Sequence, residues 1–198
     1  MSEDPGRGIP FSAEQFPHRQ SPRQLTAPNA IQSPMNDAIP FSTVPHDHQN
    51  CIDTALDEAA GLCARRGVRL TPLRRRVLEL IWDGHQPTGA YAILDALREE
   101  NHRAAPPTVY RALEFLSAHG LIHRIESLNA YIGCIRPDHD HAGQFLICES
   151  CGATAELHDE RIAKAVGQGA QRAGFRALRQ TVEVAGLCPD CHRRAEAG

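Results

Sequence analysis

Four of the seven cysteines lie in two C-x-x-C pairs near the carboxyl end of the chain. The pairs are Cys148-Glu-Ser-Cys151 and Cys188-Pro-Asp-Cys191. Two thiolates at this spacing can reach one ion, and two such pairs complete a tetrahedral shell whose usual occupant is Zn²⁺. Redox-active dithiols are the alternative. Such dithiols typically lie at the start of a helix that follows a buried strand, and the sequence predicts that neither pair lies in such a position. We therefore expect a closed structural zinc site.

A second group of possible metal ligands lies between residues 123 and 156. It consists of His123, Cys134, His139, His141 and Glu156. Nitrogen, sulfur and oxygen donors together are typical of zinc, and a thiolate disfavours hard ions such as Mg²⁺ or Mn²⁺. Because these residues come from predicted strands, a hinge and a second domain, a bound ion would fix one domain relative to the other.

The segment 51–134 is predicted to be a winged helix-turn-helix domain. Apolar residues at spacings of three and four predict four helices, which begin near Ile52, Pro72, Thr88 and Pro106. After Gly120 the period changes to two short strands, Leu121–Glu126 and Ala130–Cys134, which form a hairpin. The fourth helix would then be the recognition helix and the hairpin the wing.

The remaining segments differ in composition. Residues 1–50 hold 8 of the 14 prolines and predict a disordered tail, in which Met35 is a possible alternative translation start. The polar segment 135–143 predicts a hinge. Residues 144–194 predict a small α/β domain, for which a stabilising metal is expected at this size. Its predicted elements are strands Gln144–Cys148, Ala153–Leu157 and Phe175–Ala185 and a helix Asp159–Ala173.

The net charge of −3 does not by itself favour a nucleic-acid partner, but the basic residues are unevenly placed. Six arginines and no acid lie between Gly61 and Arg76, and Arg111 and Arg124 add charge to the recognition helix and wing. Guanidinium groups suit phosphate and guanine. No apolar stretch reaches the roughly 18 residues of a membrane span, and the first residues lack a signal peptide. We expect a cytoplasmic protein without a membrane partner.

Several of these motifs together resemble the ferric uptake regulator family of metal-responsive repressors over about residues 51–194. The matching stretches are Arg69-Leu-Thr-Pro-Leu-Arg74, Pro107-Thr-Val-Tyr-Arg-Ala-Leu113, Gly120-Leu-Ile-His123 and the two C-x-x-C pairs. The resemblance implies an α+β chain that forms a homodimer, with structural zinc on Cys148, Cys151, Cys188 and Cys191. It implies regulatory zinc on His123, Cys134, His141 and Glu156, with His139 as a competitor of His141. It implies DNA contacts from Tyr91, Thr108, Tyr110 and Arg111.

Within that family the chain resembles the zinc-responsive members. Iron-responsive members usually carry His-His-Asp-His shortly before the first C-x-x-C, whereas here His139-Asp-His141 lies further away and Cys134 supplies a thiolate. We expect a transcriptional repressor of zinc-uptake genes that binds two Zn²⁺ per chain and a palindromic double-stranded DNA operator. The alternatives are an iron- or peroxide-responsive regulator and, from another class, a zinc-ribbon enzyme or thiol oxidoreductase. Since no nucleophile–base pair is evident, we expect neither catalysis nor a small organic substrate.

Overall fold

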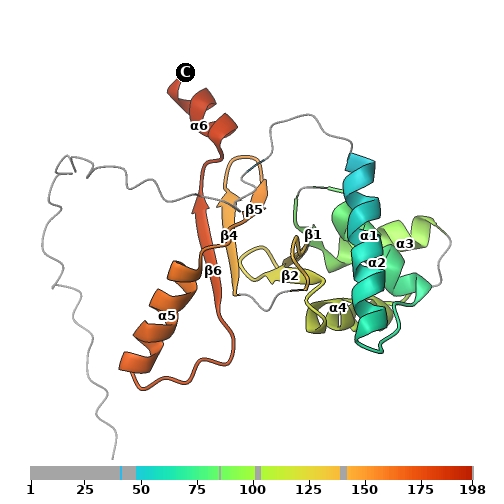
Figure 1. Cartoon of the computed structure of the whole chain (residues 1–198). Helices are drawn as coiled ribbons and strands as arrows, with labels where there is room; N and C mark the ends of the chain where they lie inside the picture. Colours follow the sequence, from blue (N-terminus) through green and yellow to red (C-terminus); the bar gives the residue numbers. More distant parts are fainter. Residues whose placement is uncertain (1–40, 42–47, 85, 101–103, 139–141, 198) are drawn as a thin grey trace, which may run out of the picture. The chain divides into compact units, whose positions relative to one another are not determined.

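The computed structural model describes residues 41, 48–84, 86–100, 104–138 and 142–197 (Figure 1). The chain divides into two units, residues 1–34 and 35–198, and all described residues belong to the second. The expected α+β class is confirmed, because four helices and a small sheet are followed by a second sheet with two further helices. Within the described ranges, every helix is too short or too polar to cross a membrane.

Four helices form the first part of this unit. They are α1 (His48–Arg65), α2 (Pro72–Trp82), α3 (Ala90–Glu99) and α4 (Pro106–Ala118). Each turns an apolar stripe inward, as Ile52, Leu56 and Ala59 do on α1. Burial of these stripes against one another makes a single hydrophobic core, in which Val77, on α2, and Leu116, on α4, are fully buried.

Local sequence signals determine where these helices begin and end. Thr71 is the N-cap of α2 and its side chain accepts a hydrogen bond from the backbone N–H of Arg74, while Pro72 occupies the first helical position. The chain leaves α1 and α4 through Gly67 and Gly120, at φ +66° and +67°. Glycine adopts this left-handed conformation without the strain that a Cβ causes, so these two glycines end the helices.

The first sheet contains β1 (Thr88–Gly89), β2 (Ile122–Ile125) and β3 (Ala130–Gly133), antiparallel in the order β1-β3-β2. The β2–β3 hairpin is the predicted wing. Thr88 was expected to open a helix, but it pairs with Tyr131 in β1 and α3 begins two residues later. Gly133 is required in this sheet, because a Cβ there would lie 2.2 Å from the ring of Trp82.

The second sheet contains β4 (Gly143–Cys148), β5 (Thr154–Glu156) and β6 (Thr181–Gly186), with α5 (Glu160–Arg172) between β5 and β6. The strand order is β5-β4-β6, so β4 is central and mostly buried. It pairs antiparallel with β5 and parallel with β6. The parallel pair requires a crossover, which α5 supplies.

Two expectations for the ends of these segments were wrong, and one helix was not predicted. The α1 helix begins at His48, inside the predicted tail, and Phe41 packs against buried cysteines. The strand predicted from Phe175 begins only at Thr181, because the backbone N–H of Phe175 bonds the carbonyl of Ala170 and closes the end of α5. A further helix, α6 (Pro189–Glu196), follows β6.

Candidate metal centres and DNA-contact surface

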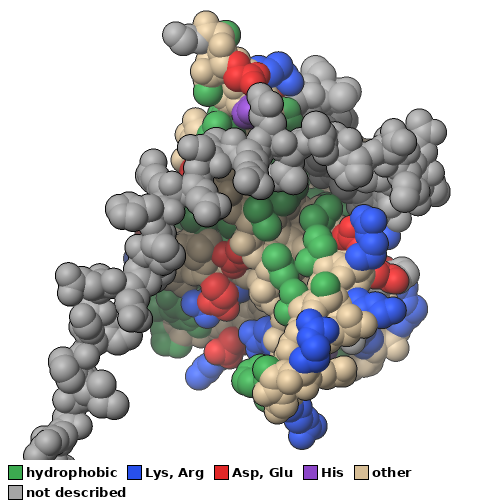
Figure 2. Space-filling model, turned by 90° about the vertical axis from the view of Figure 1, so that its left-hand side faces the viewer, with side chains coloured by type: hydrophobic (Ala, Val, Ile, Leu, Met, Phe, Trp, Pro, Cys, Tyr) green, Lys and Arg blue, Asp and Glu red, His purple; other side chains and the backbone are tan. Residues whose placement is uncertain are grey.

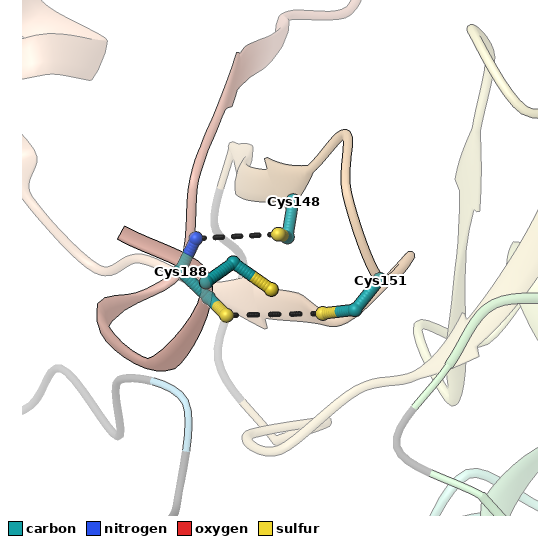
Figure 3. Close-up of side chains that lie close together, drawn as sticks. Cys148, Cys151 and Cys188 are labelled. Atoms are coloured by element: carbon teal, nitrogen blue, oxygen red, sulfur yellow. Dashed lines mark hydrogen bonds between the residues drawn. The ribbon is translucent and has the colours of Figure 1, made fainter. Parts of the chain in front are cut away.

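The four paired cysteines form one compact group, which we call the cysteine cluster (Cys148, Cys151, Cys188 and Cys191). Their Sγ atoms all lie within 4.8 Å of one another. The Sγ atoms of Cys151 and Cys188 are 3.7 Å apart (Figure 3). Four thiolates at the usual Zn–S length of about 2.3 Å in a tetrahedron would lie about 3.8 Å apart. The spacing of the sulfurs therefore fits a single tetrahedral zinc ion.

Strand pairing and a tight turn bring these cysteines together. Cys148 ends β4, and the tight turn that follows is closed by a 2.9 Å hydrogen bond from the backbone N–H of Gly152 to the carbonyl of Cys148, which keeps Cys151 close to it. In the parallel β4–β6 pair Cys148 lies opposite Gly186, which places Cys188 next to it two residues later. The backbone N–H of Cys188 donates to the Cys148 Sγ at 3.3 Å (Figure 3).

Hydrogen bonds make one thiol of this cluster acidic. The bond from the backbone N–H of Cys188, helped by those from Cys151 and Ser150, lowers the pKa of Cys148 to about 6. The neighbouring Cys151 has its pKa raised to about 12: the backbone N–H of Ala153 lowers it, but hydrogen bonding with Cys148 and burial outweigh this. Four such close thiolates need a cation to balance their charge, and a coordinated thiol is deprotonated by the metal itself.

The expectation that neither pair lies at a helix start after a buried strand is met only in part. The second pair does lie at the start of a helix, since Cys188 is the N-cap of α6 and Cys191 is in its first turn, but the preceding strand β6 is mostly exposed. The stronger argument is geometric. The two pairs converge on one point, and all four thiols are free. A redox dithiol needs only two cysteines, whereas a tetrahedral metal shell uses all four.

A second group, which we call the wing cluster, consists of His123, Cys134 and Glu156. His123 lies on β2, Cys134 directly follows β3, and Glu156 ends β5. Their donor atoms lie within 4.8 Å of one another. The cluster joins the wing of the helix-turn-helix to the second sheet. His139 and His141, the other two predicted candidates, lie outside the described residues.

The wing cluster is largely shielded from water. The His123 Nε2 lies 3.1 Å from a carboxylate oxygen of Glu156, whose side chain is only 4% exposed. The other oxygen of Glu156 accepts a hydrogen bond from the backbone N–H of Ile135 at 3.3 Å. Burial, and then the negative charge of Glu156, raise the pKa of Cys134 to about 12. A buried carboxylate beside a buried thiol is costly unless a cation pairs with them, so this donor set suits a zinc ion.

The residues expected to touch DNA are placed around the first turns of α3 and α4. Tyr91 is 69% exposed and Tyr110 is 41% exposed, which is unusual for large aromatic residues. Thr108 is half-buried in the first turn of α4, and Arg111 is exposed on the next turn. The N-terminal turn of a recognition helix is the part that reaches base edges in helix-turn-helix proteins.

The arginine-rich segment contributes less free charge than the sequence suggests. Arg76 pairs with Glu79 and Glu100. Arg74 donates to the backbone carbonyl of Arg69 and lies over the Phe115 ring, 3.5 Å from its centroid. These arginines therefore tie helices together. The other members of the segment, Arg65, Arg66, Arg69 and Arg75, are exposed.

Two contacts between the helical part and the second sheet were not predicted. The side-chain amide of Gln86 donates to the backbone carbonyl of Cys151 at 2.9 Å. The carboxylate of Glu183, on β6, accepts hydrogen bonds from the backbone N–H groups of Glu126 and Ser127 at the tip of the wing. Neither Gln86 nor Glu183 belongs to a motif, so these two contacts are seen only in the folded chain.

Comparison with known proteins agrees with this architecture. Residues 65–185 match the ferric uptake regulator family. The zinc uptake regulation protein of Escherichia coli K12 is 41% identical over 137 residues, which cover 69% of this chain and 80% of that protein. The zinc uptake regulation protein of Mycobacterium tuberculosis H37Rv is 30% identical over 128 residues, covering 63% of this chain and 95% of that protein.

Two solved structures are similar in fold and sequence. The crystal structure of holo XcZur has a TM-score of 0.67 and 42% identity, covering 71% of this chain and 99% of that chain. A zinc uptake regulator complexed with zinc and DNA has a TM-score of 0.69 and 38% identity, covering 78% of this chain and 100% of that chain. The extent of these matches, together with the two cysteine pairs and the winged helix, shows that this chain belongs to the ferric uptake regulator family.

Proposed function

We propose that this protein is a zinc-responsive transcriptional repressor that uses zinc as corepressor and controls zinc-uptake genes. The observation that carries the proposal is the wing cluster, because its donors come from both the DNA-reading part and the second sheet. The similarity to zinc uptake regulation proteins, and to one of them complexed with zinc and DNA, supports it. An iron- or peroxide-responsive role is less well supported, since the Cys134 thiolate favours zinc.

We assign the two metal sites different roles. The cysteine cluster would hold a structural zinc, and because four thiolates fill the tetrahedral shell, they leave no position for a catalytic water. This arrangement supports a regulator rather than an enzyme acting on a small organic substrate. The regulatory zinc would be bound by His123, Cys134 and Glu156, with His141 as the fourth ligand and His139 as the alternative.

The proposed response of DNA binding to zinc depends on how the wing is attached to the second sheet. A zinc ion at the wing cluster would supply bonds between the wing and β5. His123 and Cys134 would bring the wing strands to the ion, while Glu156 would anchor it to the second sheet. Zinc favours the DNA-binding arrangement only to the extent that it binds this arrangement more tightly than others.

A homodimer is supported by the surface of the second sheet. The helix α5 has no buried residue although it is strongly amphipathic, and the edge strand β6 is mostly exposed. Figure 2 shows exposed hydrophobic side chains on the face of the molecule that carries these elements. The large exposed apolar residues there are Val166, Phe175, Leu178, Val184 and Leu187. Such a face is typical of a protein–protein interface.

In the proposed dimer, two recognition helices would meet the two half-sites of a palindromic double-stranded operator. Tyr91, Thr108, Tyr110 and Arg111 are the proposed DNA contacts. Arg111 can pair with guanine or phosphate, and the exposed tyrosines can pack against the DNA backbone or thymine methyl groups.

The decisive experiment is a DNA-shift assay on the promoter of a zinc-uptake gene from the same genome. We expect binding in the presence of zinc, loss of binding when a chelator removes the exchangeable zinc, and recovery when zinc is added back. Fe²⁺ under anaerobic conditions should restore much less binding. Equal DNA affinity with and without the chelator would contradict a corepressor role, and recovery by Fe²⁺ alone would support an iron-responsive regulator.

A further inference from the structure

Three side chains lie in one row across the second sheet, on the face that meets the wing. On the central strand, Phe145 pairs with Glu156 of β5 and with Glu183 of β6. Residues that pair directly on neighbouring strands point to the same face of a sheet. We call Glu156, Phe145 and Glu183 the Glu–Phe–Glu row.

Each member of this row contacts a different part of the wing. Glu156 approaches the His123 Nε2 on β2 at 3.1 Å. The Phe145 ring lies 5.3 Å from the His123 ring, centroid to centroid, and packs with the fully buried Ile125 at the end of β2. Glu183 contacts the tip of the wing. The row therefore follows the wing from the metal ligand His123 to the turn.

The Glu183 contact is specific. One carboxylate oxygen accepts from the backbone N–H of Glu126 at 2.7 Å, and the other accepts from the backbone N–H of Ser127 at 3.1 Å. Burial acts to raise the pKa of Glu183, but the hydrogen bonds from Ser127 and Glu126 lower it below its usual value. An anionic acceptor with two N–H donors forms stronger bonds than a neutral one.

We propose that Glu183 is a positioning residue for zinc-dependent DNA binding: it holds the tip of the wing to the second sheet, so that ligation at the wing cluster fixes the whole wing. This inference rests on the proposed function. The hydrogen bonds that Glu183 accepts come from the backbone N–H groups of Glu126 and Ser127, which are neither proposed metal ligands nor proposed DNA contacts, so it acts through the wing backbone. Without it, the tip of the wing would lose its two hydrogen bonds to the second sheet.

The coupling has a thermodynamic signature. If the Glu183 contact exists only in the arrangement that binds zinc and DNA, then breaking it lowers the population of that arrangement. The zinc affinity of the DNA-free protein and the DNA affinity below zinc saturation should then both fall. A residue with a purely structural role would lower stability without this paired effect. A residue that touched DNA directly would change DNA affinity alone.

The test uses Glu183→Gln, which keeps the size of the side chain but removes its charge and one of two acceptor oxygens. Glu160→Gln is the matched control, because Glu160 is exposed at the start of α5 and the same charge is removed. Three quantities are measured on the full chain with the structural zinc loaded. They are the affinity of the second zinc by chelator competition without DNA, the DNA affinity at one fixed free-zinc concentration that leaves the wing cluster mostly empty, and hydrogen exchange of the amides of Glu126 and Ser127.

We expect about a tenfold loss of both affinities in Glu183→Gln, with faster exchange of both amides and an unchanged dimer and structural zinc. Glu160→Gln should behave as wild type. Unchanged affinities, loss in only one of them, or loss of the dimer would each overturn the proposal. The amide exchange tests the Glu183 contact separately from the proposed function. Slow exchange of the two amides in wild type and fast exchange in Glu183→Gln would show the contact even if DNA binding proves independent of zinc. In that case the proposed function fails and this coupling role fails with it.

Discussion

The two candidate metal centres differ in how the chain assembles them. The cysteine cluster takes all its donors from one sheet and the short helix that follows, within residues 148–191. The wing cluster takes its three described donors from both sheets. A metal in the first site would link segments of one domain, whereas a metal in the second would link the wing to the second sheet. The comparison teaches that the origin of the ligands, and not their chemistry alone, distinguishes a proposed structural site from a proposed regulatory one.

The largest effect is expected when the cysteine cluster is broken. Cys148→Ala removes the thiol that ends β4, and in small metal-dependent domains the structural zinc contributes on the order of 10 kcal/mol to folding. We expect loss of one zinc, loss of the dimer and unfolding of the second sheet, measured by metal content, sedimentation and circular dichroism. Cys51→Ala, at a half-buried position on α1, is the control. A well-folded Cys148→Ala dimer would rule out a structural role for the cluster.

Removing one ligand of the wing cluster should leave the fold intact but abolish zinc-dependent DNA binding. In Cys134→Ala we expect the second zinc to bind at least about 100-fold more weakly and zinc-dependent DNA binding to disappear, because one ligand of the site is lost. The structural zinc and the dimer should remain. Cys63→Ala is the matched control, because it makes the same truncation at another buried cysteine, which is 2% exposed in the core of the helices. Normal zinc-dependent DNA binding by Cys134→Ala would show that the metal is bound elsewhere.

The smallest expected effect is the pH dependence of zinc binding at the wing cluster. Because the pKa of Cys134 is raised to about 12, its thiol is protonated at neutral pH and must release a proton when zinc binds. The affinity of the wing cluster should therefore rise about tenfold per pH unit between pH 7 and 9, which competition titrations would measure. Calorimetry in two buffers of different ionisation enthalpy should show release of about one proton. A flat pH profile would mean that Cys134 is not a ligand.

The parts that the sequence predicted well depend on short-range patterns. The helices follow from apolar spacing, N-cap and proline signals, and the cysteine pairs from their internal spacing. The positions of His123, Cys134 and Glu156 could be estimated because each lies on or beside a predicted strand. The structure brings these three side chains together. Their roles as regulatory ligands stay predictions.

Features that depend on long-range pairing could not be predicted. The contact of Glu183 with the wing requires the register of the parallel β4–β6 pair, and a shift of one residue would turn Glu183 to the other face. The α6 helix was missed because its eight residues are mostly polar and show no apolar stripe. The charge of the arginine segment was overestimated because Arg76 pairs with Glu100, which lies 24 residues away.

The position of Phe41 has a consequence for the rate at which metal exchanges. Its half-buried side chain packs against the group formed by the buried Cys148, Cys188 and Cys191, while Cys151 remains exposed. A competing ligand must reach a thiolate before a metal ion can leave, and with an aromatic ring packed against the buried members the exposed Cys151 is the open approach. The residence time of a metal in the cysteine cluster would then depend on a residue that precedes the first helix.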